Sequence, residues 1–131
     1  MERIKVLLIE PMTEPRLVEV DDTLEELQRL VGGTIAATFP WKDPVALVFN
    51  DNGVEECLLP NRVLEEYKDV LLGSFFICGL GAEEFQSIPD DLASKYTEKY
   101  RWPEMFKWAE DGRLACIRNT DRGPEILTIW D

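Results

Sequence analysis

The chain has 131 residues, of which 45% are hydrophobic and 31% charged, and its formal net charge at pH 7 is −12. This balance is typical of one globular domain of ordinary size and excludes an intrinsically disordered chain. The acidity argues against direct binding to nucleic acid or to an anionic membrane, because those surfaces carry the same sign of charge.

The negative charge is concentrated in the first two-thirds of the sequence. Residues 1–91 contain 19 acidic and 7 basic side chains, whereas residues 92–131 contain 7 of each. This segregation favours a partner with a basic surface. The alternative interpretation is that the acidity only keeps the protein soluble.

The cellular compartment is predicted from what the sequence lacks and from its cysteines. The N-terminus does not have the pattern of a signal peptide, and no stretch approaches the roughly 18 apolar residues of a membrane span. Cys57, Cys78 and Cys116 are far apart, odd in number and flanked by apolar residues. They predict buried, reduced thiols in a cytoplasmic protein without membrane association.

Two strands and a helix are predicted first. Residues 4–9 and 16–20 form strands by their β-rich or alternating pattern. A helix over residues 22–31 follows, because Asp22 to Glu25 match a capping box and the apolar residues share one face. Gly32-Gly33 ends that helix.

A hairpin is predicted in the middle of the chain. Residues 34–39 and 44–50 form strands, and Asp51-Asn52-Gly53 turns the second one into residues 54–59. The segment from Leu59 to Arg62 then interrupts the sheet.

The C-terminal half is predicted to add one strand, two helical pieces and a hairpin. Val70 to Gly79 is nearly all apolar and predicts one central strand, with its glycines marking a bend. A helix opens at Ser87, and a shorter helical turn covers residues 105–109. Residues 114–119 and 126–130 form a terminal hairpin.

Together these elements predict an α+β fold with a mixed, mostly antiparallel sheet, an N-terminal helix, a C-terminal helical segment and a terminal β-hairpin. We expect a single domain over residues 1–131.

The sequence contains no histidine, which removes imidazole triads, two-histidine zinc sites and the usual proton shuttles. Lysine or carboxylates could still act as bases, and carboxylates could hold magnesium. The adjacent carboxylate pairs, however, point apart on either a strand or a helix. We therefore expect a protein that is not an enzyme and needs no cofactor or metal.

The segment around Asn61 and Arg62 is the first candidate binding site. An amide and a guanidinium at the end of a strand can be presented to an anionic ligand. In the alternative interpretation, Asn61 is a turn residue and Arg62 pairs with Glu65 or Glu66. Trp41, predicted at an exposed strand end, is a further candidate contact residue.

Several segments resemble an uncharacterised family of short proteins encoded largely by bacteriophages, prophages and conjugative elements. The matching pieces are Leu27-Gln28 through Val31-Gly32-Gly33-Thr34-Ile35, Val45 to Asn50 with Gly53, Leu59-Pro60-Asn61-Arg62, Gly73-x-x-Phe76-x-x-Gly79, and Glu84-Phe85 leading into Tyr96. A Glu usually follows the Gly-Gly-x-Ile element in that family, and Ala36 stands there in this chain. The resemblance implies a mixed α+β fold, a family-like core over residues 1–106 and a C-terminal extension with the hairpin over residues 107–131.

The leading functional hypothesis is an interaction protein of phage or mobile-element origin. It would bind and antagonise a host factor with a basic surface, such as a defence or nucleic-acid-handling protein, through acidic residues that include Glu25, Glu26, Glu55 and Glu56. The alternative is a protein that binds an anionic, nucleotide-like signal through Asn61, Arg62 and Trp41. The sequence is also compatible with a homo-oligomer.

Overall fold

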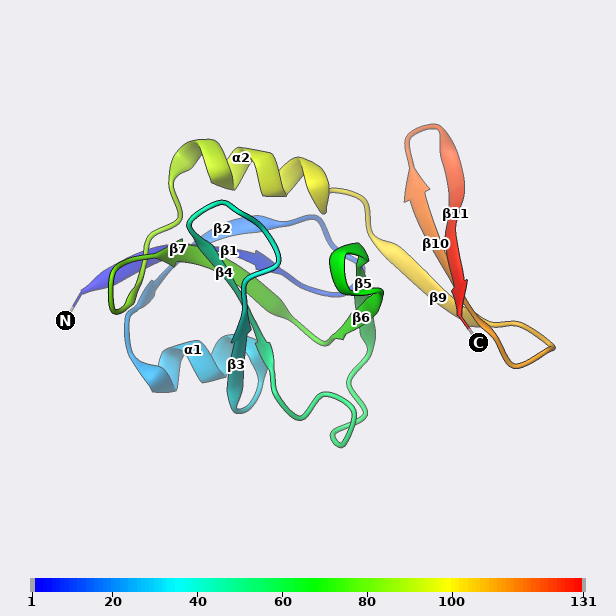
Figure 1. Ribbon diagram of the computed structural model, residues 1–131, viewed down its shortest axis with the longest axis horizontal. Coiled ribbons are helices and arrows are strands. Elements are labelled where there is room, and N and C mark those ends of the chain that lie inside the picture. Colours follow the sequence, from blue (N-terminus) through cyan, green and yellow to red (C-terminus); the bar gives the residue numbers. More distant parts are fainter. Residues whose placement is uncertain (1, 131) are drawn as a thin grey trace.

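A six-stranded antiparallel sheet forms the centre of the molecule (Figure 1). In the computed structural model, residues 2–130 are described, except for the side chains of residues 128–130. The strands of this sheet lie in the order β2-β1-β7-β4-β3, with β8 paired to β7. Their bounds are β1 Arg3–Ile9, β2 Arg16–Asp21, β3 Ile35–Thr38, β4 Val45–Asn50, β7 Phe75–Leu80 and β8 Phe85–Gln86.

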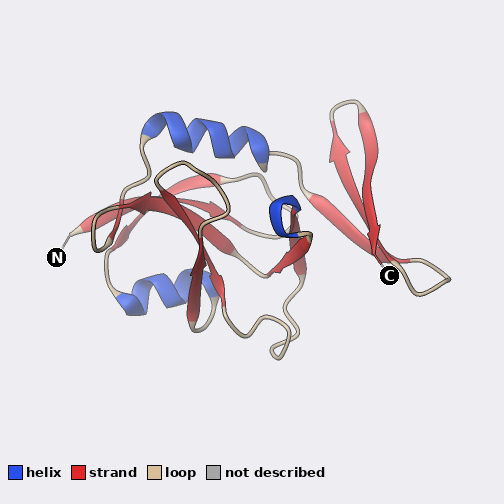
Figure 2. Cartoon of the chain, in the orientation of Figure 1, coloured by secondary structure: helices blue, strands red, loops and turns tan. Residues whose placement is uncertain are grey.

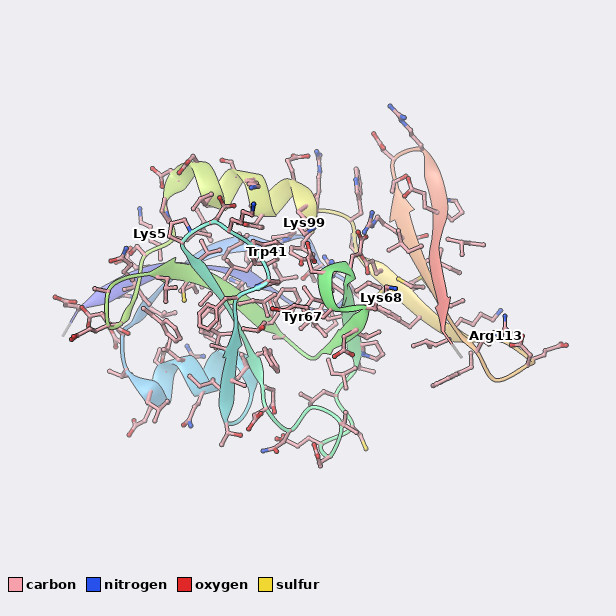
Figure 3. The ribbon with its side chains drawn as sticks, in the orientation of Figure 1. Lys5, Trp41, Tyr67, Lys68, Lys99 and Arg113 are labelled. Carbon is pink, nitrogen blue, oxygen red and sulfur yellow. The ribbon has the colours of Figure 1, made fainter. Side chains whose placement is uncertain are left out.

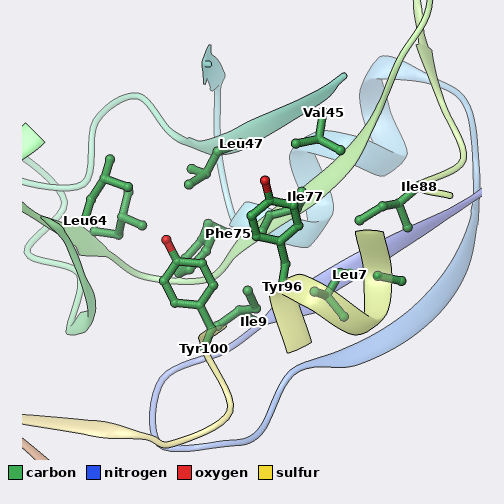
Figure 4. Packing of buried hydrophobic residues seen from close by; sticks show 12 residues of the cluster. Leu7, Ile9, Val45, Leu47, Leu64, Phe75, Ile77, Ile88, Tyr96 and Tyr100 are labelled. Atoms are coloured by element: carbon green, nitrogen blue, oxygen red, sulfur yellow. The ribbon is translucent and has the colours of Figure 1, made fainter. Parts of the chain in front are cut away.

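One helix covers each face of this sheet, which gives three layers (Figure 2). The alternation of side chains along β1, β4 and β7 sends one buried set towards each helix. The set that meets α2 (Asp90–Lys99) includes Leu7, Leu47 and Ile77, together with Tyr96 and Tyr100 (Figure 4). The set that meets α1 (Leu24–Val31) is Ile4, Val6, Leu8, Val20, Leu27, Val31, Ala46, Val48, Phe76 and Cys78.

The predicted helix over residues 22–31 is confirmed as α1, although it is not N-terminal. The chain begins with β1 at Arg3, and the first helix follows two strands. Thr23 is the N-cap, since its hydroxyl accepts a hydrogen bond from the backbone N–H of Glu26 at 3.2 Å. Gly32 ends the helix with a φ of 79°, as a left-handed glycine cap.

The predicted hairpin after β4 is wrong. Residues 51–57 form turns and no strand, and the next strand is β5, Pro60–Leu64. Pro60 to Arg62 therefore belong to a strand and do not interrupt one. β5 pairs with β6, Asp69–Leu72, in a separate two-stranded sheet, and the short helix η1, Glu65–Tyr67, connects them.

The long apolar run over residues 70–79 is two strands and not one. Gly73, with a φ of 75°, breaks it between β6 and β7, as the predicted bend required. β7 is the central strand of the main sheet and is buried from Phe75 to Gly79.

A three-stranded antiparallel sheet completes the chain, in the order β11-β10-β9. Its strands are β9 Glu104–Trp108, β10 Leu114–Thr120 and β11 Gly123–Trp130. The predicted terminal hairpin is confirmed as β10–β11, whereas the helical turn predicted over residues 105–109 is wrong. That segment is rich in aromatic residues, and pairing with β10 stabilises it as a strand.

The cysteines are all free, and two of the three are buried as predicted. Burial raises the pKa of Cys78 to about 12 and is the main reason that the pKa of Cys116 also rises to about 12. Cys57, by contrast, is exposed in the turns after β4, with a φ of 55°. None of the helices in residues 2–130 has the length and apolar character needed to cross a membrane.

We expect Gly79→Ala to destabilise the fold by about 1–3 kcal/mol, the usual cost of overpacking. A methyl group at Gly79 would lie 2.3 Å from the backbone oxygen of Ser87, which cannot move away without shifting the chain. Urea unfolding followed by tryptophan fluorescence measures the change. Ser94→Ala, at an exposed position on α2, is the control and should stay within about 0.5 kcal/mol of the wild type.

Candidate functional site: an acidic cleft beside the main sheet

A cleft of about 420 Å³ lies where the main sheet meets the β5–β6 sheet. Its volume falls within the range of about 300–1,000 Å³ that is usual for ligand pockets. We call it the acidic cleft, and its lining residues are Thr38, Phe49, Asn50, Asp51, Gly53, Val54, Glu55, Leu64, Tyr67, Asp69, Val70, Leu71 and Leu72. Figure 3 labels Tyr67 on η1, at one side of this region.

The loop after β4 forms one wall of the acidic cleft because two asparagines fold it back. The side-chain oxygen of Asn50 accepts a hydrogen bond from the backbone N–H of Asn52 at 2.7 Å, and its amide donates to the backbone oxygen of Val31 at 3.2 Å. The amide of Asn52 donates to the Thr34 hydroxyl at 3.0 Å. These bonds replace the strand pairing that a hairpin would have made.

Close packing fixes this loop on both sides. A Cβ atom at Gly53 would lie 3.1 Å from the Leu72 side chain, and one at Gly33 would lie 2.8 Å from the amide nitrogen of Asn50. The loop therefore lies against β6 on one side and against the end of α1 on the other.

The floor of the acidic cleft is apolar, and its edge is negatively charged. Leu64 and Leu71 are buried, Val54 and Tyr67 are 75% and 52% exposed, and the Thr38 hydroxyl donates to the Tyr67 oxygen at 3.2 Å. Asp51, Glu55 and Asp69 are exposed, and none of them forms an ion pair with a described residue. The described lining contains no Lys or Arg. The cleft is thus suited to a cation that also carries apolar surface.

The four glutamates predicted as partner contacts lie in two separate places. Glu55 lines the acidic cleft, and Glu56 is exposed beside it, near Gly33 at the C-terminal end of α1. Glu25 and Glu26 lie in the first turn of α1, at its other end. Glu26 pairs with Arg29 three residues later, and this contact lowers the pKa of the Glu26 carboxyl.

Asn61 and Arg62 point into the interior and not towards solvent, since both are 0% exposed. The Asn61 amide donates to the backbone oxygens of Ile9 and Gly73, each at 2.9 Å. Both residues contact main chain that belongs to distant elements. Their role in ligand binding, predicted from the sequence, stays a prediction.

The guanidinium of Arg62 is bound mainly by backbone oxygens. It donates to Thr13 at 2.6 Å, to Tyr100 at 2.9 and 3.2 Å, and to the side-chain oxygen of Asn61 at 2.8 Å. Burial lowers the pKa of Arg62, although the charge of Glu104 opposes that shift. The pairing with Glu65 or Glu66 that the sequence left open does not form.

Trp41 lies away from the acidic cleft and is half-buried. Its ring centroid is 4.4 Å from that of Tyr96, and its indole N–H donates to Glu66 at 2.9 Å. Lys99 lies 3.1 Å from the same carboxylate oxygen of Glu66. Trp41 therefore packs against the core beneath α2, near Lys99 in Figure 3, and its role as a contact residue stays a prediction.

Glu104 is a buried charge that the sequence analysis missed. It is 1% exposed, accepts a hydrogen bond from the backbone N–H of Val63 at 2.8 Å and pairs with Arg118 at 3.1 Å. These contacts attach β9 and β10 to β5. The only sequence signal was a polar residue next to Pro103, which does not reveal burial.

Within residues 2–130, no three Asp, Glu or Cys side chains form a group that could hold a metal ion.

Comparison with known proteins identifies the family. The model of the family described as Domain of unknown function (DUF3846) matches residues 4–101. The chain belongs to this family. No curated protein and no solved structure matches it.

The DUF3846 match begins in β1 and ends just after α2. The acidic cleft lies wholly inside the matched residues, and the β9–β11 sheet lies outside them. The resemblance to an uncharacterised family, predicted from the sequence, is thereby confirmed.

Replacing Glu104 tests whether the β9–β11 sheet is held to the DUF3846 core by this carboxylate. We expect Glu104→Ala to lower the free energy of unfolding by about 3 kcal/mol, because Arg118 and the Val63 N–H lose a buried partner. Urea unfolding provides the measurement. Glu110→Ala, at an exposed position between β9 and β10, is the matched control, and an equal effect of both changes would contradict the assignment.

Asp43 should contribute to stability in a pH-dependent way. Lys95 and Tyr96 donate to its carboxylate at 2.7 and 2.6 Å, and these bonds lower the pKa of Asp43. The stabilisation is complete above the ordinary carboxyl pKa, near 4, and is lost as the pH falls through the lowered value.

Thermal unfolding between about pH 7 and pH 2 tests this expectation. The stability difference between wild type and Asp43→Asn should be largest at neutral pH and should shrink towards zero in acid. Asp121→Asn, which removes an exposed carboxylate without an ion pair among the described residues in the turn between β10 and β11, is the control and should stay within about 0.5 kcal/mol of the wild type over this range. A difference for Asp43→Asn that stays constant with pH would contradict the assigned role.

Proposed function

We propose that this protein is a non-enzymatic interaction protein whose acidic cleft binds a basic segment of a partner protein. The supporting observation is the acidic cleft itself, an apolar cavity edged by three carboxylates and lined by no described cation. A lysine or arginine side chain matches this arrangement, because its aliphatic stem can pack on Phe49 and Tyr67 while its charge meets Asp51, Glu55 or Asp69.

The charge of the whole chain supports the same partner. The negative excess lies in residues 1–91, which contain every residue of the cleft. The resulting field would attract a basic surface over a longer distance than the contacts themselves and would speed its association.

We further propose that the partner is a host factor, such as a defence or nucleic-acid-handling protein, which this chain antagonises on behalf of a phage or mobile element. Nucleic-acid-handling proteins carry basic surfaces, and an acidic protein can occupy them by charge complementarity. The acidity of the chain and the resemblance of its sequence to phage and mobile-element proteins support this choice of partner.

The small-molecule alternative has less support. It required Arg62 to clamp an anionic ligand, yet the Arg62 guanidinium is buried and donates to backbone oxygens and Asn61. An anion would also meet repulsion at the acidic cleft.

The test compares two triple variants with the same change of charge. The cleft variant combines Asp51→Asn, Glu55→Gln and Asp69→Asn, and the control combines Glu2→Gln, Asp91→Asn and Glu110→Gln, all at exposed positions. Tagged wild-type protein is used to capture partners from a host lysate, bound proteins and small molecules are identified by mass spectrometry, and the captured protein is purified for titration.

We expect the cleft variant to bind the purified partner about tenfold more weakly, because it loses three partly exposed ion pairs. Binding of the wild type should also weaken as the salt concentration rises. Equal affinities of the two triple variants, or binding that is insensitive to salt, would rule out the cleft as the docking site.

A further inference from the structure

The outer edge of β6 runs along the acidic cleft. Successive side chains of a strand point to opposite faces, so a cavity on one face of a strand would contact only every second residue. All four residues of β6, Asp69 to Leu72, line the cleft. The cleft therefore follows the edge of this strand, where backbone groups point outwards.

Two hydrogen bonds show which backbone groups lie on the outer edges of the β5–β6 sheet, where Val63 on β5 and Val70 on β6 are register partners. The backbone N–H of Val63 donates to the Glu104 carboxylate at 2.8 Å. That of Val70 donates to the carboxylate of its neighbour Asp69, also at 2.8 Å. The two valines are thus a non-hydrogen-bonded pair, in which the N–H and C=O of each residue point away from the other strand.

The two outer edges of this sheet are closed in different ways. Glu104 is 1% exposed and also pairs with Arg118, so a buried ion pair closes the edge at Val63. Asp69 is exposed and forms no ion pair with a described residue, so its bond to Val70 can exchange for a bond to a ligand. Charged side chains commonly protect a free strand edge in this way, because an unpaired edge is a template for another chain.

The loop after β4 limits how much of the β6 edge is open. A Cβ atom at Gly53 would lie 3.1 Å from the Leu72 side chain, so this loop covers the end of the strand. Among the described strands β6 pairs with β5 alone. The open part of the edge is therefore centred on the N–H and C=O of Val70.

We propose that an extended basic segment of the partner adds a strand to the outer edge of β6 and pairs its backbone with Val70. This inference rests on the proposed function and specifies how the partner binds in the acidic cleft. An extended segment can supply backbone bonds to a strand edge, whereas a helix has already paired its own N–H and C=O groups.

The charges of the cleft select a basic segment as the added strand. Asp51, Glu55 and Asp69 edge the cleft in which this strand lies. A lysine or arginine of the segment draws the Asp69 carboxylate away from the Val70 N–H, which then donates to a backbone oxygen of the partner. Charge recognition and strand pairing are thereby coupled through one carboxylate.

Calorimetric titration with a seven-residue peptide of alternating lysine and valine tests the pairing. The peptide is used unmodified, N-methylated on either set of alternate amides, and N-methylated on all interior amides. The amides of a strand alternate between its two edges, so each half-methylated form keeps one free edge and the fully methylated form keeps none. We expect at least one half-methylated form to bind within about threefold of the unmodified peptide, and the fully methylated form to bind at least about tenfold more weakly.

Val70→Pro and Val70→Ala separate the backbone of this residue from its side chain. Proline removes the N–H of residue 70, which takes no part in pairing with β5, and proline is tolerated at such edge positions. We expect Val70→Pro to weaken binding of the unmodified peptide at least about tenfold and Val70→Ala to leave it within about threefold. Circular dichroism shows whether each variant is folded, and the methylated peptides carry the test if Val70→Pro is not.

Several results would overturn the proposal. Equal affinities of the unmodified and fully methylated peptides, or unchanged binding by folded Val70→Pro, would mean that side chains alone bind. Loss of binding by both half-methylated forms would indicate a helical segment. Absence of binding by the unmodified peptide up to about 1 mM would exclude the pairing as well. The proposed function is tested separately, by the affinities of the captured partner for the two triple variants, and can stand when this inference fails.

Discussion

The interior polar bonds of β5 hold the β5–β6 sheet against the rest of the molecule, together with Leu64 and Leu71, which belong to the hydrophobic cluster beneath α2. Asn61 and Arg62 bind backbone oxygens in the β1–β2 connection, at Gly73 and at the end of α2. A buried guanidinium is costly to desolvate, and charged hydrogen bonds of about 1.5–3 kcal/mol each offset that cost. Among the described residues β5 pairs with β6 alone, so these bonds and the packing of Leu64 and Leu71 place the β5–β6 sheet relative to the main sheet and position the acidic cleft.

The same strand also determines how the C-terminal sheet is attached. The backbone N–H of Val63 on β5 donates to Glu104 on β9, and Glu104 in turn pairs with Arg118 on β10. A buried guanidinium, on Arg62, and a buried carboxylate, on Glu104, therefore meet at β5. The Asn61–Arg62 network faces the family core, and the Glu104–Arg118 network faces the sheet outside the family match. The extension is thus joined to the core through polar contacts with β5 and with Glu65 on η1, and neither buried hydrophobic cluster includes a described residue of β9–β11.

The sequence predicted the elements whose signals are local. The glycine stop of α1, the β-rich or alternating patterns of β1 and β2, and the hairpin of β10 and β11 depend on neighbouring residues, and all are confirmed. The capping box predicted from Asp22 to Glu25 is displaced by one residue, since Thr23 and Glu26 form the cap. The predictions of secondary structure were wrong where contacts between residues far apart in the sequence determine the local conformation. Asp51-Asn52-Gly53 has hairpin chemistry, but Asn50 and Asn52 bind Val31 and Thr34 instead, contacts that periodicity cannot reveal.

The candidate site shows the same division between local and distant information. Glu55, one of the glutamates predicted as a partner contact, lines the acidic cleft, but nothing in the sequence places Asp51, Asp69 and Tyr67 beside it. Conversely, Asn61 and Arg62 are residue types that often bind anionic ligands, but here both are buried and donate hydrogen bonds to backbone oxygens. The sequence of a polar pair next to a proline does not distinguish a ligand-binding site from a buried structural site. What distinguishes the two is whether other chain segments supply acceptors for every donor of the pair. Here backbone oxygens of three separate segments accept these hydrogen bonds.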